Sequence, residues 1–499
     1  MWSQQRRRLL GTVTGLKPFE TIPGPKGKGL PILGHSNELL KKPYGFGKAW
    51  KNVQRLREAY CGQVPLLRFH VPLVNPKGNG NLVYLFESED IQQVYRHEGK
   101  YPTRGPGFEA YKMMRETRAD IFAGTTGVLM EEGEKWHAIR SKVQQDLMRP
   151  KSAHFYLSEI LKVSQEFVQY IRHRRCPQTK IIQDCLPEIY LYSFESISYI
   201  ALDARLGCLK TEMDPEIKQV FQCLQDFLSS FEGLLLGVPT WKYFPNPRWN
   251  AVYRKAQDDL NILLDFGKRK VEDAILRADL SSQDGGELSV LEKLIKRNGS
   301  DSPYPLVMAL DMIFAGIDTT GTTIAVLLYH LSMNPDKQDK LREECLSFTE
   351  ITVNNLDKLK YLKACLLESM RLTPIVPTQG RIINEDMIIS GYHIPKGTFV
   401  MWSTNMLGMD DNKFPNPHEF LPERWIEDKK SIHPFALRPF GHGPRMCIGK
   451  RFAELETYIV MHRLITHFQV HWMTSEPLTM TQQLLNVPDQ KMDFRFDDL

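Results

Sequence analysis

The longest unbroken apolar stretch of the sequence, from residue 306 to residue 332, sets the strongest limit on how the chain can fold. An α-helix of this length spans about 40 Å at about 1.5 Å per residue, which is enough to cross a whole domain. The stretch is not continuous hydrocarbon, because Asp311, Asp318 and several threonines interrupt it. Burying a charged group is costly unless it serves a purpose. We therefore predict a buried central helix that carries functional polar groups.

The rest of the sequence predicts a mainly α fold with a small β portion. Of the 499 residues, 42% are hydrophobic, and long segments of helical periodicity outnumber short β-branched runs. Because no long low-complexity linker separates these segments, we expect a single large domain. Helices are predicted over 131–149, most of 155–275, a short part of 280–305, 356–373 and from about 449 onward, and strands over 82–86 and within 381–401.

Charge and cysteine content exclude several classes of protein. The net charge of +5 is mildly basic and far from that of a nucleic-acid-binding domain, so no nucleic acid partner is expected. The eight cysteines form no CxxC pair and follow no disulfide or zinc spacing. A reducing compartment is the simplest interpretation, and only Cys447 lies in a context that indicates chemistry.

The N-terminus has no run of 18 or more apolar residues, so we expect no membrane-spanning helix there. It carries Arg6, Arg7 and Arg8, with no acidic residue before Glu20, a composition typical of a mitochondrial targeting peptide. We expect residues 1–20 to be a targeting segment or a basic tail, and residues 21–499 to form the catalytic domain.

Cys447 lies in the segment 440–449, FGHGPRMCIG, whose composition suits a metal-bound thiolate. A free thiol has a pKa of about 8.5, and coordination to a metal removes its proton. Glycines let the backbone turn sharply and approach closely, so that N–H groups can point at the sulfur. A helix that begins near Gly449 would add its positive end at the same place.

This segment resembles the haem-binding loop of the cytochrome P450 superfamily and matches its FxxGxRxCxG pattern at every fixed position. The resemblance covers about residues 20–490 and implies the fold of that superfamily, with the iron of haem b bound to the thiolate of Cys447. It also implies that Arg445 neutralises a haem propionate, that Phe440 shields the sulfur from water, and that Gly449 belongs to the haem site.

Two further motifs of the superfamily precede this loop in the expected order. Glu368 and Arg371 match its ExxR motif, in which residues three apart lie on one face of a helix. Arg424, in the PERW segment, matches the third member of the superfamily's buried Glu-Arg-Arg network. The resemblance gives these three residues a structural role behind the haem.

The central helix carries the segment AGIDTT, from Ala315 to Thr320, which resembles the oxygen-activation motif. A threonine hydroxyl can bond to a carbonyl one turn earlier and loosen the helix locally. The resemblance implies that Gly316 leaves room for dioxygen, that Thr319 hydrogen-bonds it, and that Asp318 relays protons. Ala315 would contact the haem and the substrate.

Other residues match the superfamily's propionate-binding positions. Trp136 and Arg140 form its WxxxR pair on one helix, and Arg381 matches a further arginine on the strand after the ExxR helix. No flavin or nicotinamide motif is found in the sequence, so electrons must come from a separate protein.

The segment 361–374 resembles the mitochondrial class of the superfamily, particularly its vitamin D and arthropod members. This resemblance implies the kind of electron donor. Lys363, Lys450 and Arg451 stand at basic positions of that class, which bind an adrenodoxin-type ferredoxin; Leu367 replaces a second basic residue. NADPH would then be used indirectly, and the enzyme would be peripheral on the matrix side of the mitochondrial inner membrane. A microsomal-type enzyme of the endoplasmic reticulum, fed by a flavoprotein reductase, is the alternative.

The resemblance implies monooxygenation of a lipophilic small molecule: a steroid, a secosteroid, an ecdysteroid-like hormone or a xenobiotic. Substrate contacts are expected from 105–127, 225–240, 374–380, Ala315 and Thr319. A haem-thiolate isomerase or dehydratase is an alternative, against which Asp318 and Thr319 argue. A non-catalytic haem or lipid carrier is another, and titration with an azole would test it.

Overall fold

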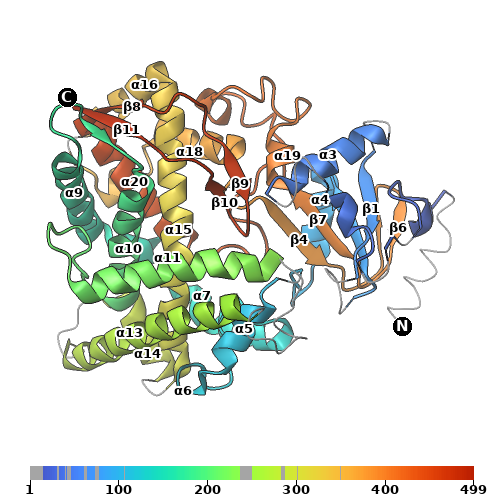
Figure 1. Ribbon diagram of the computed structural model, residues 1–499, viewed down its shortest axis with the longest axis horizontal. Helices are drawn as coiled ribbons and strands as arrows, with labels where there is room; N and C mark the ends of the chain where they lie inside the picture. Colours follow the sequence, from blue (N-terminus) through green and yellow to red (C-terminus); the bar gives the residue numbers. More distant parts are fainter. Residues whose placement is uncertain are drawn as a thin grey trace. The chain divides into compact units, whose positions relative to one another are not determined.

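The computed structural model describes residues 15–499 except 28, 31–32, 40, 42–46, 61–63, 73–77, 106, 237–249, 282–286, 300–301 and 349. The chain divides into two compact units that alternate along the sequence (Figure 1). The strand unit comprises Met1–Pro106, Thr378–Phe414 and His433–Pro444. The helical unit comprises Gly107–Pro377, Pro415–Ile432 and Arg445–Leu499. Most of the expected targeting segment and the whole of Cys61 lie outside the described residues.

A four-stranded sheet forms the centre of the strand unit, in the order β1-β2-β7-β4. The parallel pair β2–β7 lies between two antiparallel pairs, and the strands are β1 Leu66–His70, β2 Asn81–Leu85, β7 Phe399–Ser403 and β4 Thr378–Ile382. The hairpin β5 Met387–Ile389 and β6 Tyr392–Ile394 turns at Gly391, whose φ of 78° favours glycine. The predictions of strands at 82–86 and within 381–401 are therefore confirmed, whereas β1 was not predicted.

The helices α3 Ala49–Ala59 and α4 Ser88–His97 belong to the same unit. Two clusters of buried side chains stabilise the strand unit, and β2 contributes alternate residues to each. Val83 and Leu85 belong to one cluster, and Leu82 and Tyr84 belong to the other. Because side chains alternate across a strand, β2 is buried on both faces.

The central helix of the helical unit is α15, Pro303–Met333, which confirms the helix predicted over 306–332 (yellow in Figure 1). Ser302 caps its first turn by accepting the Tyr304 N–H. By length and composition alone α15 could cross a membrane, but most of its apolar window is buried inside the unit. It packs against α10 Leu186–Leu202, and α11 Pro215–Leu236 lies beside α13 Ala251–Ser281 (Figure 1).

The remaining helices of this unit agree largely with the sequence. Predicted helices are found as α7 Gly133–Leu147, α14 Val290–Asn298, α18 Lys360–Leu372 and α20 Lys450–His467. The segment 155–275 is more divided than expected, because α9 Leu157–Arg174 is followed by the short strand β3 Ile181–Ile182, and α10 ends at a left-handed Asp203. Its other helices and turns are α5 Glu109–Glu116, α6 Ala119–Phe122, α8 Pro150–His154, α16 Pro335–Leu346, α17 Val353–Leu356 and η2 Pro422–Trp425. The strand unit also contains α2 Ser36–Leu39, α19 Thr404–Gly408 and η1 Phe19–Thr21.

The C-terminal strands were not predicted. The strand β11 Phe494–Asp498 lies between β3 and β8 Phe468–Trp472, and β9 Met480–Gln482 pairs with β10 Asn486–Pro488. The strands β9 and β10 have three residues each, too few for an alternation of polar and apolar residues to be recognised. The sequences of β8, FQVHW, and of the start of β11, Phe494–Phe496, do alternate, and that signal was missed.

Candidate haem-thiolate site

The thiol of Cys447 is exposed and lies just before the first turn of α20, whose N-cap is Gly449. The N–H groups of that turn place partial positive charge near the sulfur. The other described cysteines are free thiols that are buried or half-buried. Cys447 is therefore the described cysteine that offers its sulfur to a ligand.

The three glycines of the segment 440–449 are suited to their positions for different physical reasons. Gly441 and Gly443 have φ values of 71° and 73°, which L side chains rarely adopt. In the strand unit, a Cβ at Gly443 would also overlap the Glu98 carboxylate. Gly449 has an ordinary φ of −86°, and a Cβ there would meet no described protein atom within 4 Å. The space beside Gly449 is open to a non-protein group.

Arg445 is buried beside Trp136, which lies on α7. Its guanidinium stacks over the Trp136 ring at 4.0 Å, donates to the Glu131 carbonyl at 2.9 Å and pairs with Glu132 at 2.5 Å. Trp136 is only 1% exposed, and its Nε1–H has no hydrogen-bond partner among the described residues. A buried unpaired donor costs about 1–3 kcal/mol, so this indole N–H fits an absent acceptor such as a haem propionate.

Arg140, one turn after Trp136, has a partner that the sequence did not predict. It donates to the carbonyl of Met446, the residue before Cys447, at 2.8 Å. Arg140 therefore holds the Cys447 loop against α7, and its predicted contact with a propionate stays a prediction.

Glu368, Arg371 and Arg424 are brought together in the helical unit, all of them buried. Glu368 accepts two bonds from Arg371, at 2.9 and 2.7 Å, and one from Arg424 at 3.0 Å. It also accepts the Trp425 indole N–H at 2.8 Å and the Leu421 N–H at 3.0 Å. The sequence motifs did not indicate Trp425 as a member of this network, although it directly follows Arg424.

Both arginines also bind backbone carbonyls of the segment 415–419. Arg371 donates to Pro417 at 2.6 Å and to Glu419 at 3.0 Å, and Arg424 donates to Pro415 at 2.9 Å. The network thus joins α18 to the irregular chain that precedes η2.

On α15, the Thr319 hydroxyl donates to the Ala315 carbonyl at 2.6 Å. A threonine can form this bond with the carbonyl one helical turn before it. The Ala315 side chain is exposed, and Asp318 is half-buried. Loss of contact with water raises the pKa of Asp318 to about 7. A Cβ at Gly316 would lie 2.7 Å from Ile197 of α10, and the room for dioxygen expected at this glycine stays a prediction. Its lack of a side chain lets α10 approach α15.

Two predicted haem residues belong to the strand unit. Arg381 is buried, pairs with Glu98 at 2.5 Å and stacks over the Tyr95 ring at 5.1 Å. The predicted contact of Arg381 with a propionate stays a prediction. Phe440 is half-buried in the same unit.

The three predicted docking cations gather around Glu454 of α20. Lys450 and Arg451 lie 3.7 and 3.6 Å from its carboxylate. Burial raises the pKa of Glu454, and the charges of Lys450, Arg451 and Lys363 oppose that shift. Lys363 also pairs with Asp357 at 2.8 Å, so part of this positive charge is compensated by acids.

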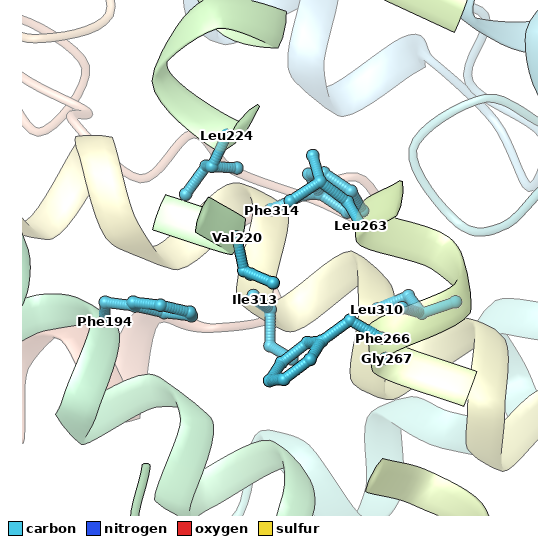
Figure 2. A pocket seen from close by; sticks show the side chains of 9 residues that line it. All are labelled: Phe194, Val220, Leu224, Leu263, Phe266, Gly267, Leu310, Ile313 and Phe314. Carbon is cyan, nitrogen blue, oxygen red and sulfur yellow. The ribbon is translucent and has the colours of Figure 1, made fainter. Parts of the chain in front are cut away.

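The expected substrate segments fall in different places. The described part of the segment 225–240 ends at residue 236. In the segment 374–380, residues 378–380 belong to the strand unit. At the start of that segment, the side-chain amide of Asn486 donates to the Pro374 carbonyl at 2.6 Å. A small apolar cavity lies between α10, α11, α13 and α15, with Phe194 and Leu310 in its wall (Figure 2). It does not include Ala315 or Thr319.

Comparisons with known proteins agree with this geometry. The sequence model of the family described as Cytochrome P450 matches residues 23–496. The Musca domestica protein Cytochrome P450 CYP12A2 is 36% identical over 452 residues, covering 85% of this chain and 82% of that protein. The Drosophila melanogaster protein Probable cytochrome P450 12a5, mitochondrial, is 34% identical over 509 residues, covering 97% of this chain and 91% of that protein.

The chain belongs to the cytochrome P450 family. It is accordingly an oxidoreductase of the monooxygenase type, and haem is the cofactor inherent to that family.

Proposed function

We propose that the chain binds haem b through the thiolate of Cys447. Its propionates would be held by the Trp136 indole N–H, by Arg445 and by Arg140 of the helical unit. The observation that carries this proposal is the exposed thiol at the start of α20, together with the buried, unpartnered Trp136 donor on α7. The haem, when bound, supplies a redox-active iron at which one atom of dioxygen enters the substrate and the other becomes water.

The chain itself supplies protons through Asp318 and Thr319. A carboxyl group with a pKa of about 7 can both give and take a proton near neutral pH. The Thr319 hydroxyl donates to Ala315, so its oxygen lone pairs stay available to accept from water. This pair is expected in an enzyme that uses external electrons and protons, and it argues against the isomerase or dehydratase alternative.

The substrate is proposed to be a lipophilic small molecule: a steroid, a secosteroid, an ecdysteroid-like hormone or a xenobiotic. Three aromatic rings from separate elements support an apolar substrate. Tyr111 of α5, Phe227 of α11 and Phe314 of α15 contact one another with ring centroids 5.4–6.2 Å apart. Tyr111 and Phe227 are buried and Phe314 is half-buried, so the three rings form an apolar wall beside α15.

The electron donor is proposed to be an adrenodoxin-type ferredoxin, itself reduced at the expense of NADPH. The cations Lys363, Lys450 and Arg451 would attract its acidic surface. The word mitochondrial in the names of several relatives supports a place in mitochondria, peripheral on the matrix side of the inner membrane. The endoplasmic reticulum, with a flavoprotein reductase as donor, is the alternative.

The test is oxygen consumption by the haem-loaded protein with a lipophilic substrate and NADPH. One reaction contains an adrenodoxin-type ferredoxin and its reductase, and the other contains a microsomal flavoprotein reductase. Faster consumption with the ferredoxin supports the proposed donor, and faster consumption with the flavoprotein overturns it. No consumption with either donor, under conditions where both reduce the iron, would favour the isomerase or dehydratase.

A further inference from the structure

The helical unit contains a buried ion pair that is not part of any motif considered above. Arg115, at the end of α5, is 0% exposed, and its Nη1 lies 2.5 Å from Oδ1 of Asp311 on α15. Nη1 also donates to the Thr126 carbonyl at 2.8 Å, and Nη2 donates to the Tyr111 hydroxyl at 2.6 Å. The other carboxylate oxygen of Asp311 accepts the Val128 N–H at 3.0 Å.

These contacts fix a particular stretch of chain. Residues 117–128, here called the roof segment, include α6, which packs against α15. Phe122 of α6 lies under the Arg115 guanidinium at 5.0 Å. At Gly127, φ is 93°, and a Cβ would lie 2.5 Å from Asp311 and 2.7 Å from Arg115. The main chain therefore lies directly against the ion pair, and glycine is required there.

The same end of this stretch has a second tie. The carboxylate of Glu131 accepts the Thr126 N–H at 3.0 Å and the Thr126 hydroxyl at 2.7 Å. The Glu131 carbonyl in turn accepts from Arg445, two residues before Cys447. The roof segment is thus held at Asp311 on α15 and, through Glu131, at the Cys447 loop.

The position of Asp311 on α15 relates the roof segment to the proposed site. Ala315 and Thr319 follow Asp311 at four-residue intervals, and residues four apart lie on the same side of a helix. The roof segment is therefore held against the side of α15 that carries Ala315 and Thr319. A buried ion pair is weak evidence for a gain in stability, because desolvation offsets the attraction of the charges. Positioning is the better explanation for retaining it.

We propose that Arg115 and Asp311 form a positioning clasp that holds the roof segment over this side of α15 and so sets the size of the molecules that the site accepts. This inference rests on the proposed function, because it assumes that Ala315 and Thr319 face the substrate. Neither residue is a catalytic residue; both act through the backbone that they hold.

The test uses the haem-loaded full chain in four clasp variants: Asp311→Asn, Arg115→Met, the double variant Arg115→Met/Asp311→Asn, and Gly127→Ala. The double variant leaves no unpaired buried charge, so it is the variant best able to fold. Arg269→Gln is the matched control, because Arg269 of α13 pairs with Glu216 of α11, both are exposed, and neither belongs to the roof segment. Two probes are titrated spectrally: imidazole, which is small, and clotrimazole, a bulky triphenylmethyl imidazole.

The clasp predicts that clotrimazole binds about tenfold or more weakly to every clasp variant, while imidazole affinity changes less than about twofold. Hydrogen exchange of the amides in 117–128 should accelerate by about tenfold, with Arg269→Gln unchanged in both assays. Equal loss of both azoles, or an unchanged ratio with unchanged exchange, would overturn the proposal. The exchange experiment needs no haem, so it tests the clasp even if the proposed haem site is wrong. If wild type binds neither azole, that result counts against the proposed function and not against the clasp.

Discussion

The buried network around Glu368 gives the sharpest prediction of stability. The substitution Glu368→Gln keeps the shape of the side chain but removes the charge that faces Arg371 and Arg424. The wild-type carboxylate accepts from both guanidinium groups, from the Trp425 indole and from the Leu421 N–H. An amide NH2 group has no acceptor to offer these donors, so two buried cations would lose their counter-charge.

The expected cost follows from this burial. Removing one partner of a buried ion pair destabilises a protein by about 3–5 kcal/mol. The entropy of unfolding is about 2 cal/mol/K per residue, which gives about 1 kcal/mol/K for a chain of 499 residues. The midpoint of thermal unfolding should therefore fall by about 3–5 °C, which circular dichroism or scanning calorimetry can measure on the haem-loaded protein.

A control with the same spacing separates burial from pairing. Asp339 pairs with Arg342 three residues later, as Glu368 does with Arg371, but Asp339 is 60% exposed. Exposed pairs contribute about 0–1 kcal/mol, so Asp339→Asn should lower the midpoint by about 1 °C or less. Equal shifts in the two variants, or no shift in Glu368→Gln, would refute the reasoning that burial makes this network strong.

Three further predictions concern the proposed site. Asp318 has a pKa of about 7 in the folded protein against 3.8 when unfolded, so the folded state holds its proton more tightly and loses stability as the pH rises from about 4 to about 7. Asp318→Asn should therefore gain stability relative to wild type over the same range, from about pH 4 to about pH 7, in urea unfolding, and a constant difference would contradict this. Trp136→Phe should remove the proposed hydrogen bond to a charged propionate, which contributes about 1.5–3 kcal/mol. Transfer of haem to apomyoglobin should therefore become about ten- to a hundredfold more favourable. Trp472→Phe is the control and should match wild type, because the Trp472 indole donates to the Glu476 carbonyl. Lys450→Gln should raise the KM for ferredoxin several-fold at low ionic strength and less at high salt. The control Lys296→Gln, at an exposed position on α14, should leave this KM unchanged. A rise in KM that persists at high salt would argue against electrostatic docking.

The features that the sequence could predict depend on short spacings. Glu368 and Arg371 are three residues apart on one helix, and Thr319 and Ala315 are four apart, so helical geometry alone brings each pair together. The apolar length of α15 likewise predicts its burial.

The features that it could not predict join distant parts of the chain. Arg115 and Asp311 are 196 residues apart, and no local pattern indicates that they meet. Arg381 and Glu98 are 283 residues apart. The reason for Gly316 depends on Ile197 of another helix, so the motif located this glycine but did not explain its packing. Short strands such as β9 and β10 have too few residues for a periodic signal.

The most direct test of the central claim is a carbon monoxide difference spectrum of the purified, haem-loaded protein. It is recorded after reduction by an adrenodoxin-type ferredoxin with its reductase and NADPH, and again after reduction by dithionite. A strongly red-shifted Soret band with both reductants is the predicted result, and Cys447→Ala should abolish it. A band with dithionite alone would keep Cys447 as the ligand and contradict the ferredoxin route. The absence of the band with both reductants would contradict the assignment of Cys447 as the haem ligand.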